Sequence, residues 1–273
     1  MSQIIRNFVY IIVFVLFAQI STLNAGTTGS EELKGSDSGN TAKECFEGVS
    51  RAMFKLNYGL DKVVFQPIAK GYRALPSPVR KATGNATNNL RSLLTVSNNV
   101  LQGDFKKAGK TAGRFAINTT VGILGIFDPA SHLGIEDEGK EDFGQTLGVW
   151  GADSGCYFVL PILGPTTTRD AIGLVGNVLI DPVYQITHNS EISNGVVGNG
   201  NYSEHNYDYY RSTGAVDFRA KNIESFKSLE ENSIDLYASL KSLYIQSRNQ
   251  KISNSKSITE TQDDSDWEEI ETN

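Results

Sequence analysis

Apolar residues recur at steps of three and four along much of the chain, which is the spacing that places them on one face of a helix. The segment from Lys43 to Tyr72 shows this spacing first and predicts one amphipathic helix, or two in line. Pro67 should bend or divide it, because an internal proline loses a hydrogen bond and clashes with the preceding turn. The apolar face would either pack on a core or meet lipid or a partner protein.

Two further helices are indicated downstream. Ser77 and Pro78 combine a capping hydroxyl with a proline at the first helical position, so a helix is expected from Pro78 to about Leu101. Asp104 should cap the next helix, which begins at Phe105. The apolar face of the first of these helices comprises Val79, Ala82, Ala86, Leu90 and Leu93 or Leu94.

The helix from Phe105 changes character along its length. It starts with basic residues and then passes into FAINTTVGILGIF, where nearly every side chain is apolar, small or a hydroxyl. A basic half followed by an apolar half suits a segment at the lipid headgroup boundary. A helix that runs from the surface into an ordinary core is the alternative. The basic residues are Lys106, Lys107, Lys110 and Arg114.

The stretch from Glu141 to Asp170 is where function is expected first. Its sequence, EDFGQTLGVWGADSGCYFVLPILGPTTTRD, is too broken by glycine and proline for a long helix and too apolar for a solvated loop. Asp142, Arg169 and Asp170 flank it and are interpreted as an ion-pair set that holds its ends together. A charge that contacts a lipid headgroup is the alternative.

The rest of the chain completes a mostly helical prediction. Residues Thr166 to Thr168 can cap a helix from about Arg169 to Leu179, while His188 to Gly214 lacks periodicity and predicts a loop or a weakly ordered insertion. A last helix should extend from Val216 to about Ile252, with an interruption near Asn232. Strand alternation is absent except in the central stretch, and the fold class is therefore all-α.

Charge and length limit which partners and how many domains are expected. The chain of 273 residues carries a net charge of −6, and the residues from Ser253 onward account for all of it. The remainder is close to neutral and has no basic excess to neutralise phosphates, so a nucleic-acid partner is not expected. The length favours one domain with tails, and the acidic tail, residues 253–273, should be disordered.

The first 25 residues have the outline of a secretory signal peptide. Arg6 precedes an apolar run from Phe8 to Ile20, and Ala25 ends the segment. An uncleaved anchor is the alternative, although the run is shorter than the ~20 residues that span a bilayer. Residues 26–43 are interpreted as a flexible tether, and residues 44–252 as the helical domain.

The chain shows no catalytic pattern. It has no Gly-x-Ser-x-Gly elbow, and its three histidines lack metal-ligand spacing. We therefore expect neither an enzyme nor a metal or other cofactor. Cys45 and Cys156 could form a disulfide that closes a loop of ~110 residues, worth ~4 to 5 kcal/mol on the chain-entropy model, or they could be two buried or free thiols.

Several long motifs resemble, in the same order, those of the MlaA family, also called VacJ, of bacterial outer-membrane proteins. The resemblance covers residues from about Glu44 to Ile252. Its motifs are MFKLNYGLDK at Met53, PIAKGYRALPSPVRK at Pro67, NNVLQGDF at Asn98, GRFAINTTVGILGIFDPASHLG at Gly113, and the central FGQTLGVWG and VLPILGPTTTRD.

The resemblance implies a ring-like arrangement of amphipathic helices around a central amphipathic channel, with a Gly-rich apolar hairpin-like segment. Such proteins lie in the inner leaflet of the outer membrane, at its periplasmic face, beside porin trimers. They take mislocalised phospholipid from the outer leaflet and pass it to a periplasmic carrier of the MlaC type, without covalent chemistry. A non-transporting porin-binding scaffold or surface factor is the alternative function.

The resemblance makes the central stretch a hinged apolar element beside the lipid path, with Gly144 and Gly148 as its flex points. The residues expected to line or gate this path are Phe143, Gly144, Leu147, Gly148, Val149, Trp150, Tyr157, Phe158 and Leu160.

Two departures from the family pattern concern the cysteines. No cysteine follows the signal segment, and Cys45 is not in a lipidation motif, so an acyl anchor is not expected. Cys45 and Cys156 both stand where the family usually has proline, in ECFEGVSR and in Gly155-Cys156-Tyr157. This coincidence favours a disulfide between them.

Overall fold

A computed structural model of the chain describes residues 42–188 and 205–253. All of these residues belong to one compact unit, Asn40–Asn273. Apart from a small three-stranded sheet, the elements in the described ranges are helices, as predicted. The segments interpreted as signal peptide, tether and acidic tail lie outside the described residues, except for the first and last positions next to the domain.

The first predicted helix is one continuous helical run of three parts. It begins at Glu47, later than expected, because Lys43–Glu44 forms the short strand β1. A five-residue π-helical turn, η1, directly precedes Pro67, and such a turn inside a helix accommodates a residue that cannot donate to the regular hydrogen-bond ladder. The three parts are α2 (Glu47–Leu60), η1 (Asp61–Phe65) and α3 (Gln66–Arg73).

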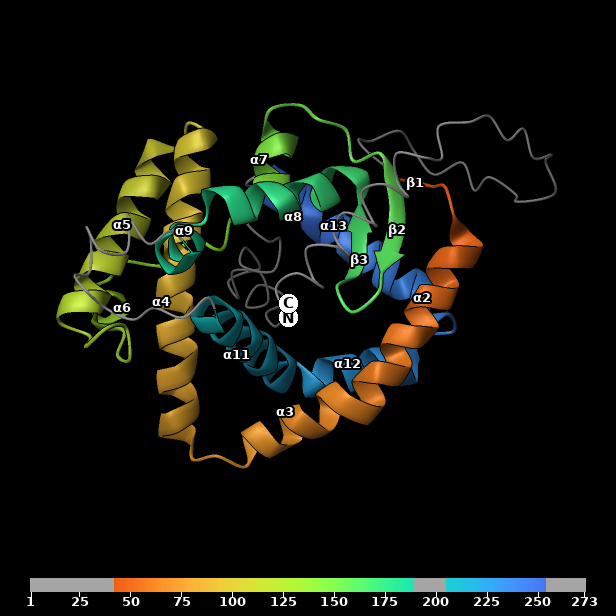
Figure 1. Cartoon of the computed structure of the whole chain (residues 1–273), viewed down its shortest axis with the longest axis horizontal. Coiled ribbons are helices and arrows are strands. Elements are labelled where there is room, and N and C mark those ends of the chain that lie inside the picture. Colours follow the sequence, from red (N-terminus) through yellow and green to blue (C-terminus); the bar gives the residue numbers. More distant parts are fainter. Residues whose placement is uncertain (1–41, 189–204, 254–273) are drawn as a thin grey trace, which may run out of the picture. The chain divides into compact units, whose positions relative to one another are not determined.

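Helices α4 (Ser77–Leu101) and α5 (Phe105–Thr120) form a hairpin and pack along each other (Figure 1). Asp104 caps α5 as predicted, by accepting a hydrogen bond from the backbone N–H of Lys107. The predicted cap at Ser77 was wrong: Pro76 occupies the cap position without a side-chain bond, and Ser77 is already helical.

Short helices with side-chain caps follow. Asp128 caps α6 (Pro129–His132), Asp142 caps α7 (Phe143–Val149), and Thr167 caps α8. The prediction of a threonine-capped helix was confirmed to within a residue at each end, since α8 spans Thr168–Ile180. It is followed by α9 (Pro182–His188).

The central stretch divides into α7, a β-hairpin and the start of α8. Strands β2 (Cys156–Leu160) and β3 (Gly164–Thr167) are antiparallel, with Tyr157 opposite Thr167, and β1 adds in parallel to β2 with Lys43 opposite Cys156. At the hairpin tip Gly164 and Ile162 have positive φ, of 84° and 67°. That conformation favours glycine and is strained for the β-branched isoleucine.

The loop predicted from His188 to Gly214 was wrong in its second half, because α11 begins at His205. Tyr207 is buried there and packs on Tyr184, so aromatic contacts stabilise a segment without aliphatic periodicity. Residues 189–204 lie outside the described part. The expected interruption near Asn232 was confirmed. The elements are α11 (His205–Lys221), α12 (Ile223–Asn232) and α13 (Leu236–Ile252).

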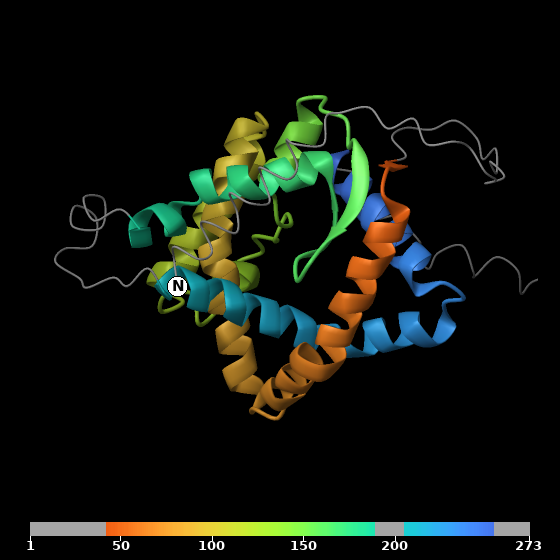
Figure 2. The same cartoon turned by 45° about the vertical axis from the view of Figure 1, so that its right-hand side comes forward.

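The elements of this unit form a closed circuit of contacts (Figures 1 and 2). Helix α3 packs on α11, and α11 on α4. Helix α4 packs on α7, and α7 on both α8 and α13. The circuit returns through α8 and the β2–β3 hairpin to α2. The predicted ring-like arrangement of helices is thus present, and the hairpin is part of its wall.

Candidate functional site

Polar side chains fill the interior of this protein. Among the described residues, buried polar and charged side chains outnumber buried apolar ones, and most of the latter are alanine or tyrosine. Soluble domains show the reverse, with Leu, Ile, Val and Phe as the usual buried residues. None of the described helices combines the length and apolar character needed to cross a bilayer. The apolar side chains must therefore be found on the outside.

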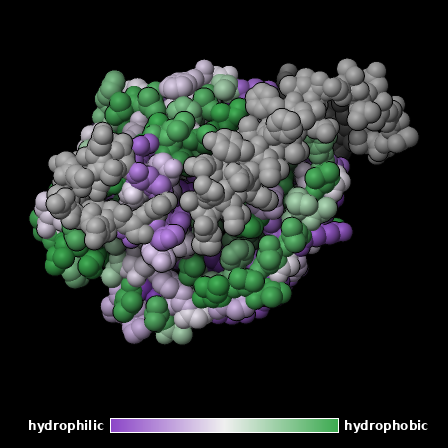
Figure 3. Space-filling model, in the orientation of Figure 1, coloured by the Kyte–Doolittle hydropathy of each residue, from purple (hydrophilic) through white to green (hydrophobic). Residues whose placement is uncertain are grey.

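The apolar stripe of α2, η1 and α3 is one such outer surface. The sequence left open whether this stripe faces a core or meets lipid or a partner, and most of it is exposed, reaching 76% at Val63. Hydrophobic residues line this edge of the molecule in Figure 3. The exposed side chains are Phe46, Val49, Leu56, Val63, Val64, Phe65 and Ile68.

A second apolar surface is the loop that follows α5, residues 121–127. The helix ends at Thr120, so the apolar half does not continue as a helix into a core. Ile123 and Leu124 have φ of 53° and 56°, a conformation that a β-branched residue adopts only under constraint. Gly125 packs closely on α4, because a Cβ on it would lie 2.5 Å from the Cβ of Asn89. The exposed side chains are Val121, Ile123, Leu124, Ile126 and Phe127.

The basic half of α5 has partners within the protein. Lys107 lies 3.7 Å from Asp104, Lys110 pairs with Glu138, and Arg114 lies 3.0 Å from a carboxylate oxygen of Asp128. The Lys110 pair attaches α5 to the acidic loop that precedes α7, and the Arg114 pair attaches it to the start of α6, whereas Asp104 is the cap of α5 itself. The basic residues therefore have a structural role whether or not they also meet a headgroup.

Close glycine contacts seat α7 against α8 and α13. A Cβ on Gly173 would lie 2.5 Å from the Cα of Gly144, and a Cβ on Gly148 would lie 2.6 Å from the side chain of Ile252. Gly144 and Gly148 both lie inside α7 with ordinary negative φ. The structure thus gives the two predicted flex points a packing role.

Arg248 joins the two ends of the central stretch. Its guanidinium lies 2.6 and 2.9 Å from the carboxylate of Asp142 and 2.8 Å from that of Asp170. Arg169 and the hydroxyl of Tyr244 also bond Asp170, at 3.0 and 2.6 Å. The predicted ion-pair residues are therefore brought together by an arginine that the sequence analysis missed, since it lies 106 positions from Asp142.

Electrostatics hold both carboxylates ionised. Burial alone would raise the pKa of Asp142, but the hydrogen bonds and charge of Arg248 lower it well below its ordinary value of 3.8. The pKa of Asp170 is lowered in the same way: burial opposes ionisation, and Arg248, Tyr244 and Arg169 outweigh it. The cluster is a fixed electrostatic junction of α7, α8 and α13.

A hydrogen-bond network attaches α7 to α4. The side-chain amide of Gln102 donates to Glu141 and to Thr146, both at 3.1 Å, and the Thr146 hydroxyl donates to Asn98 at 2.8 Å. Burial raises the pKa of Glu141. The signal that could have found this network is the polar face of α4, which recurs at helical spacing as Asn89, Ser92, Thr95, Asn98, Asn99 and Gln102.

The predicted lipid-path residues differ in how far the structure buries them. Tyr157 is almost fully buried in a core cluster with Val159 and Tyr237, and therefore does not line an open path. Trp150 is exposed, and its indole N–H donates to the carbonyl of Leu101 at 3.0 Å. The ring of Phe143 meets it edge-on at 5.8 Å. Val149 is also exposed, while Leu147, Phe158 and Leu160 are half-buried.

Cys45 and Cys156 are joined by a disulfide in the structure, with their Cα atoms 5.5 Å apart. The bond lies beside the pairing of Lys43 with Cys156, so it fixes β1 to the edge of the hairpin. The start of the domain is thereby attached to the central stretch.

Known proteins resemble the chain in sequence and structure. A family model described as MlaA lipoprotein matches residues 42–251. An uncharacterized protein of Rickettsia prowazekii is 40% identical over 146 residues, which cover 53% of this chain and 58% of that protein. The chain therefore spans little more than half the length of that relative.

Two further matches cover most of the chain. The intermembrane phospholipid transport system lipoprotein MlaA of Haemophilus influenzae is 31% identical over 218 residues, 79% of this chain and 81% of that protein. A solved structure described as the structural basis for maintenance of bacterial outer membrane lipid asymmetry aligns with a TM-score of 0.63 at 28% identity. That alignment covers 77% of this chain and 99% of the other.

Proposed function

Because the chain belongs to the MlaA lipoprotein family, we propose that it removes mislocalised phospholipid from the outer leaflet of the outer membrane. It passes the lipid to a periplasmic carrier of the MlaC type, in the retrograde direction, while bound beside a porin trimer. The process is transport without covalent chemistry, and the protein is not an enzyme. It resides at the periplasmic face of the outer membrane.

The observation that carries this proposal is the inverted distribution of side chains. Apolar residues of α2, η1, α3 and the 121–127 loop point outward, while asparagine, threonine and charged residues occupy the interior. A protein of this kind presents apolar side chains to acyl chains and offers polar groups to a headgroup, with its backbone bonds satisfied internally.

The dimensions agree with residence in one leaflet. Half of a hydrocarbon core is ~15 Å thick, and ~10 helical residues cover that distance. Helix α2 has 14 residues and α5 has 16. Elements of this length match a leaflet without spanning the bilayer.

The lipid path is proposed to run past the exposed end of α7. Trp150 and Phe143 offer a packed aromatic pair there, beside Val149 and Leu147. Phe158 and Leu160 on the hairpin complete the candidate set. Tyr157 is left out because it belongs to the core.

A substitution pair at Trp150 tests the proposal. Trp150→Glu places a charge on the path, whereas Trp150→Phe keeps an aromatic ring against Phe143 and removes only the hydrogen bond to Leu101. Each variant is expressed in a Gram-negative strain that lacks its own family member, and outer-leaflet phospholipid is measured by its accessibility to added phospholipase.

Trp150→Glu should leave outer-leaflet phospholipid at the level of the empty-vector strain, and Trp150→Phe should restore it close to wild type. Protein amount and membrane location are measured in parallel to show that both variants fold. Normal lipid asymmetry with a folded Trp150→Glu protein would contradict the proposed path. A wild-type protein that fails to restore asymmetry and carries no phospholipid would favour the porin-binding scaffold instead.

A further inference from the structure

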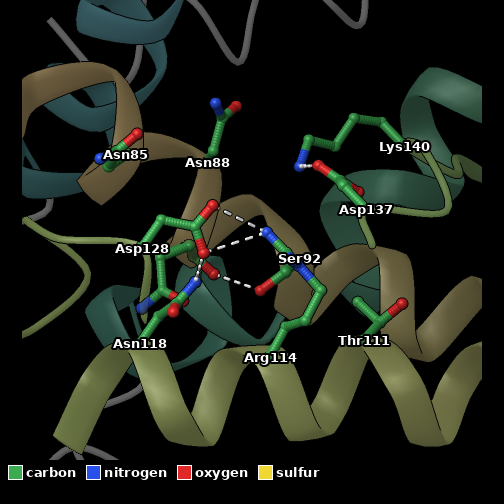
Figure 4. A pocket seen from close by; sticks show the side chains of 10 residues that line it. Asn85, Asn88, Ser92, Thr111, Arg114, Asn118, Asp128, Asp137 and Lys140 are labelled. Atoms are coloured by element: carbon green, nitrogen blue, oxygen red, sulfur yellow. Dashed lines mark hydrogen bonds and ion pairs between the residues drawn. The ribbon is translucent and has the colours of Figure 1, made fainter. Parts of the chain in front are cut away.

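Two adjoining hollows lie at the corner made by α4, α5 and the loops around α6. The first is polar and has a volume of ≈ 60 Å³ (Figure 4), which is room for about four water molecules or one small polar group. The second is mainly apolar and has a volume of ≈ 620 Å³. Asn85 and Asp128 line both hollows, so the two adjoin.

The polar hollow contains two ion pairs. Arg114 bonds both carboxylate oxygens of Asp128, at 3.0 and 3.1 Å, and the ammonium of Lys140 lies 3.1 Å from Asp137. Figure 4 shows the second pair across the hollow from the first. Burial would raise the pKa of each aspartate, but their hydrogen bonds and cationic partners lower it, so both are ionised at neutral pH. The wall therefore carries equal positive and negative charge.

Polar groups remain available in this hollow. In the described part of the chain, the side chains of Thr111 and Asn88 have no hydrogen-bond partner, and Thr111 is 7% exposed. The Lys140 ammonium has three donors, of which one is directed at Asp137. The Thr111 hydroxyl and the amide of the exposed Asn88 can therefore still donate hydrogen bonds to a ligand.

The apolar hollow lies between the first turns of α4 and the 121–127 loop. Pro78 and Ala82 form one wall, and Val121, Ile126 and Phe127 form the other. The loop is held in place, because Gly125 packs on Asn89 and the side-chain amide of Asn85 donates to the carbonyl of Ile126 at 3.1 Å. The apolar hollow is thus a formed groove that lies next to the polar hollow.

We propose that this corner binds one phospholipid with a zwitterionic phosphate–amine headgroup, with part of the headgroup in the polar hollow and an acyl chain in the groove. The headgroup phosphate accepts hydrogen bonds from Lys140, Thr111 and Asn88, and its amine is directed at Asp137. A charge-balanced pocket next to an apolar groove matches the polar and apolar parts of such an amphiphile.

The site is distinct from the path proposed at α7, because none of its lining residues belongs to α7 or to the hairpin. It rests on the proposed function only in taking phospholipid as the ligand class. A lipid seated here holds the 121–127 loop and α5 against the leaflet and sets which headgroup is preferred.

Native mass spectrometry of the full chain in detergent tests the site, with phosphatidylethanolamine and phosphatidylglycerol of identical acyl chains as probes. Ala82→Trp fills the groove, and Ala112→Trp makes the same substitution at an exposed position of α5 outside both hollows. Thr111→Val removes the unpaired hydroxyl and keeps the side-chain shape, so the headgroup half is tested without loss of packing.

Wild type and Ala112→Trp should bind phosphatidylethanolamine alike, and more tightly than phosphatidylglycerol. Ala82→Trp should weaken binding about tenfold or more, and Thr111→Val by about two- to tenfold, the range of one hydrogen bond. Equal binding by wild type and Ala82→Trp, or no headgroup preference in wild type, overturns the site. Lost binding with normal lipid asymmetry supports this site and leaves the path at α7 intact, whereas retained binding without transport counts against the proposed function alone.

Discussion

Arg248 is the residue on which three helices of the described chain converge. It is half-buried and bonds a carboxylate from the start of α7 and another from the start of α8. Its Nε atom is buried without a hydrogen-bond partner among the described residues, so the whole interaction is carried by the two terminal nitrogens. Because Asp142 and Asp170 are also helix-capping or first-turn residues, the same charges fix helix starts and helix packing.

Replacing Arg248 with glutamine should destabilise the protein by about 3 to 5 kcal/mol at neutral pH, since it leaves buried carboxylates uncompensated. The pKa values of Asp142 and Asp170 lie below the ordinary 3.8 in the folded wild type. The stability that the two ionised carboxylates add to the folded protein is therefore complete above pH 3.8. It is lost as the pH falls below 3.8 toward their lower pKa values in the folded state. In the variant the carboxylates take up protons more easily, so the stability difference from wild type should shrink as the pH is lowered from 7 to 3.

The measurement is the free energy of unfolding in detergent at several pH values. Lys227→Gln is the control, because Lys227 and Glu231 form an exposed pair at 3.6 Å whose loss should change stability by less than about 1 kcal/mol. A pH-independent difference between wild type and Arg248→Gln would show that the cluster does not act through its charges.

Gly173 provides a test of the close packing between α8 and α7. A Cβ at this position would lie 2.5 Å from the Cα of Gly144, and backbone cannot move aside as a flexible side chain can. Gly173→Ala should therefore lower stability by about 1 to 3 kcal/mol. Gly109→Ala is the matched control, since no atom would lie within 4 Å of a Cβ added there. Alanine is also the better helix former, by up to ~1 kcal/mol. The thermal midpoint should fall for the first variant and stay level or rise for the second.

At the scale of elements, periodicity predicted where helices lie but could not say what their faces meet. On α4 the predicted apolar face contains Val79 and Leu90, which are exposed, while Asn98 and Thr95 on another face are buried. A period of 3.6 shows which residues share a face, and the environment of that face is decided by the whole molecule. In a polar interior the usual assignment of apolar residues to the core is reversed.

The site was predictable only where its residues are close in sequence. Asp142, Arg169 and Asp170 were identified because they flank one stretch, whereas Arg248 is brought to them by tertiary packing alone. The start of α11 was missed for a related reason. Tyr207 stabilises this start by contacting Asp181 and Tyr184, which lie more than 20 residues earlier in the chain. Helix propensity reflects only neighbouring residues and could not reveal these contacts.

The Cys45–Cys156 bond gives a prediction at this scale. It spans 111 residues, and closure of a loop of that size is worth ~4.7 kcal/mol on the chain-entropy model. Reduction should therefore lower the thermal midpoint markedly and release β1 from the hairpin. The double variant Cys45→Ser, Cys156→Ser should match the reduced protein and show no response to reductant. An unchanged midpoint on reduction of wild type would mean that the bond adds no stability.

At the scale of the molecule, the described residues form a closed circuit of helices that exposes many apolar side chains. Its small clusters of buried apolar residues, such as Tyr157 with Val159 and Tyr237, or Ala69 with Ala220, leave much of the packing to hydrogen bonds and ion pairs. Ordinary soluble domains derive most of their stability from apolar burial. Here the outward apolar side chains would be removed from water only by a lipid environment or by a partner protein.

Membrane residence should therefore depend on single outward positions. Val63 in η1 is 76% exposed, and placing a charge there should cost about 2.5 to 3.5 kcal/mol if the side chain enters hydrocarbon. Val63→Glu should strongly reduce the fraction of purified protein that floats with phospholipid vesicles, yet leave its thermal midpoint in detergent unchanged, because the side chain makes little internal contact. Asn206→Glu adds the same carboxylate at an exposed polar position of α11 and should float like wild type. Equal flotation of all three proteins would show that η1 does not meet lipid, and the outward apolar stripe would then have to be assigned to contact with another protein.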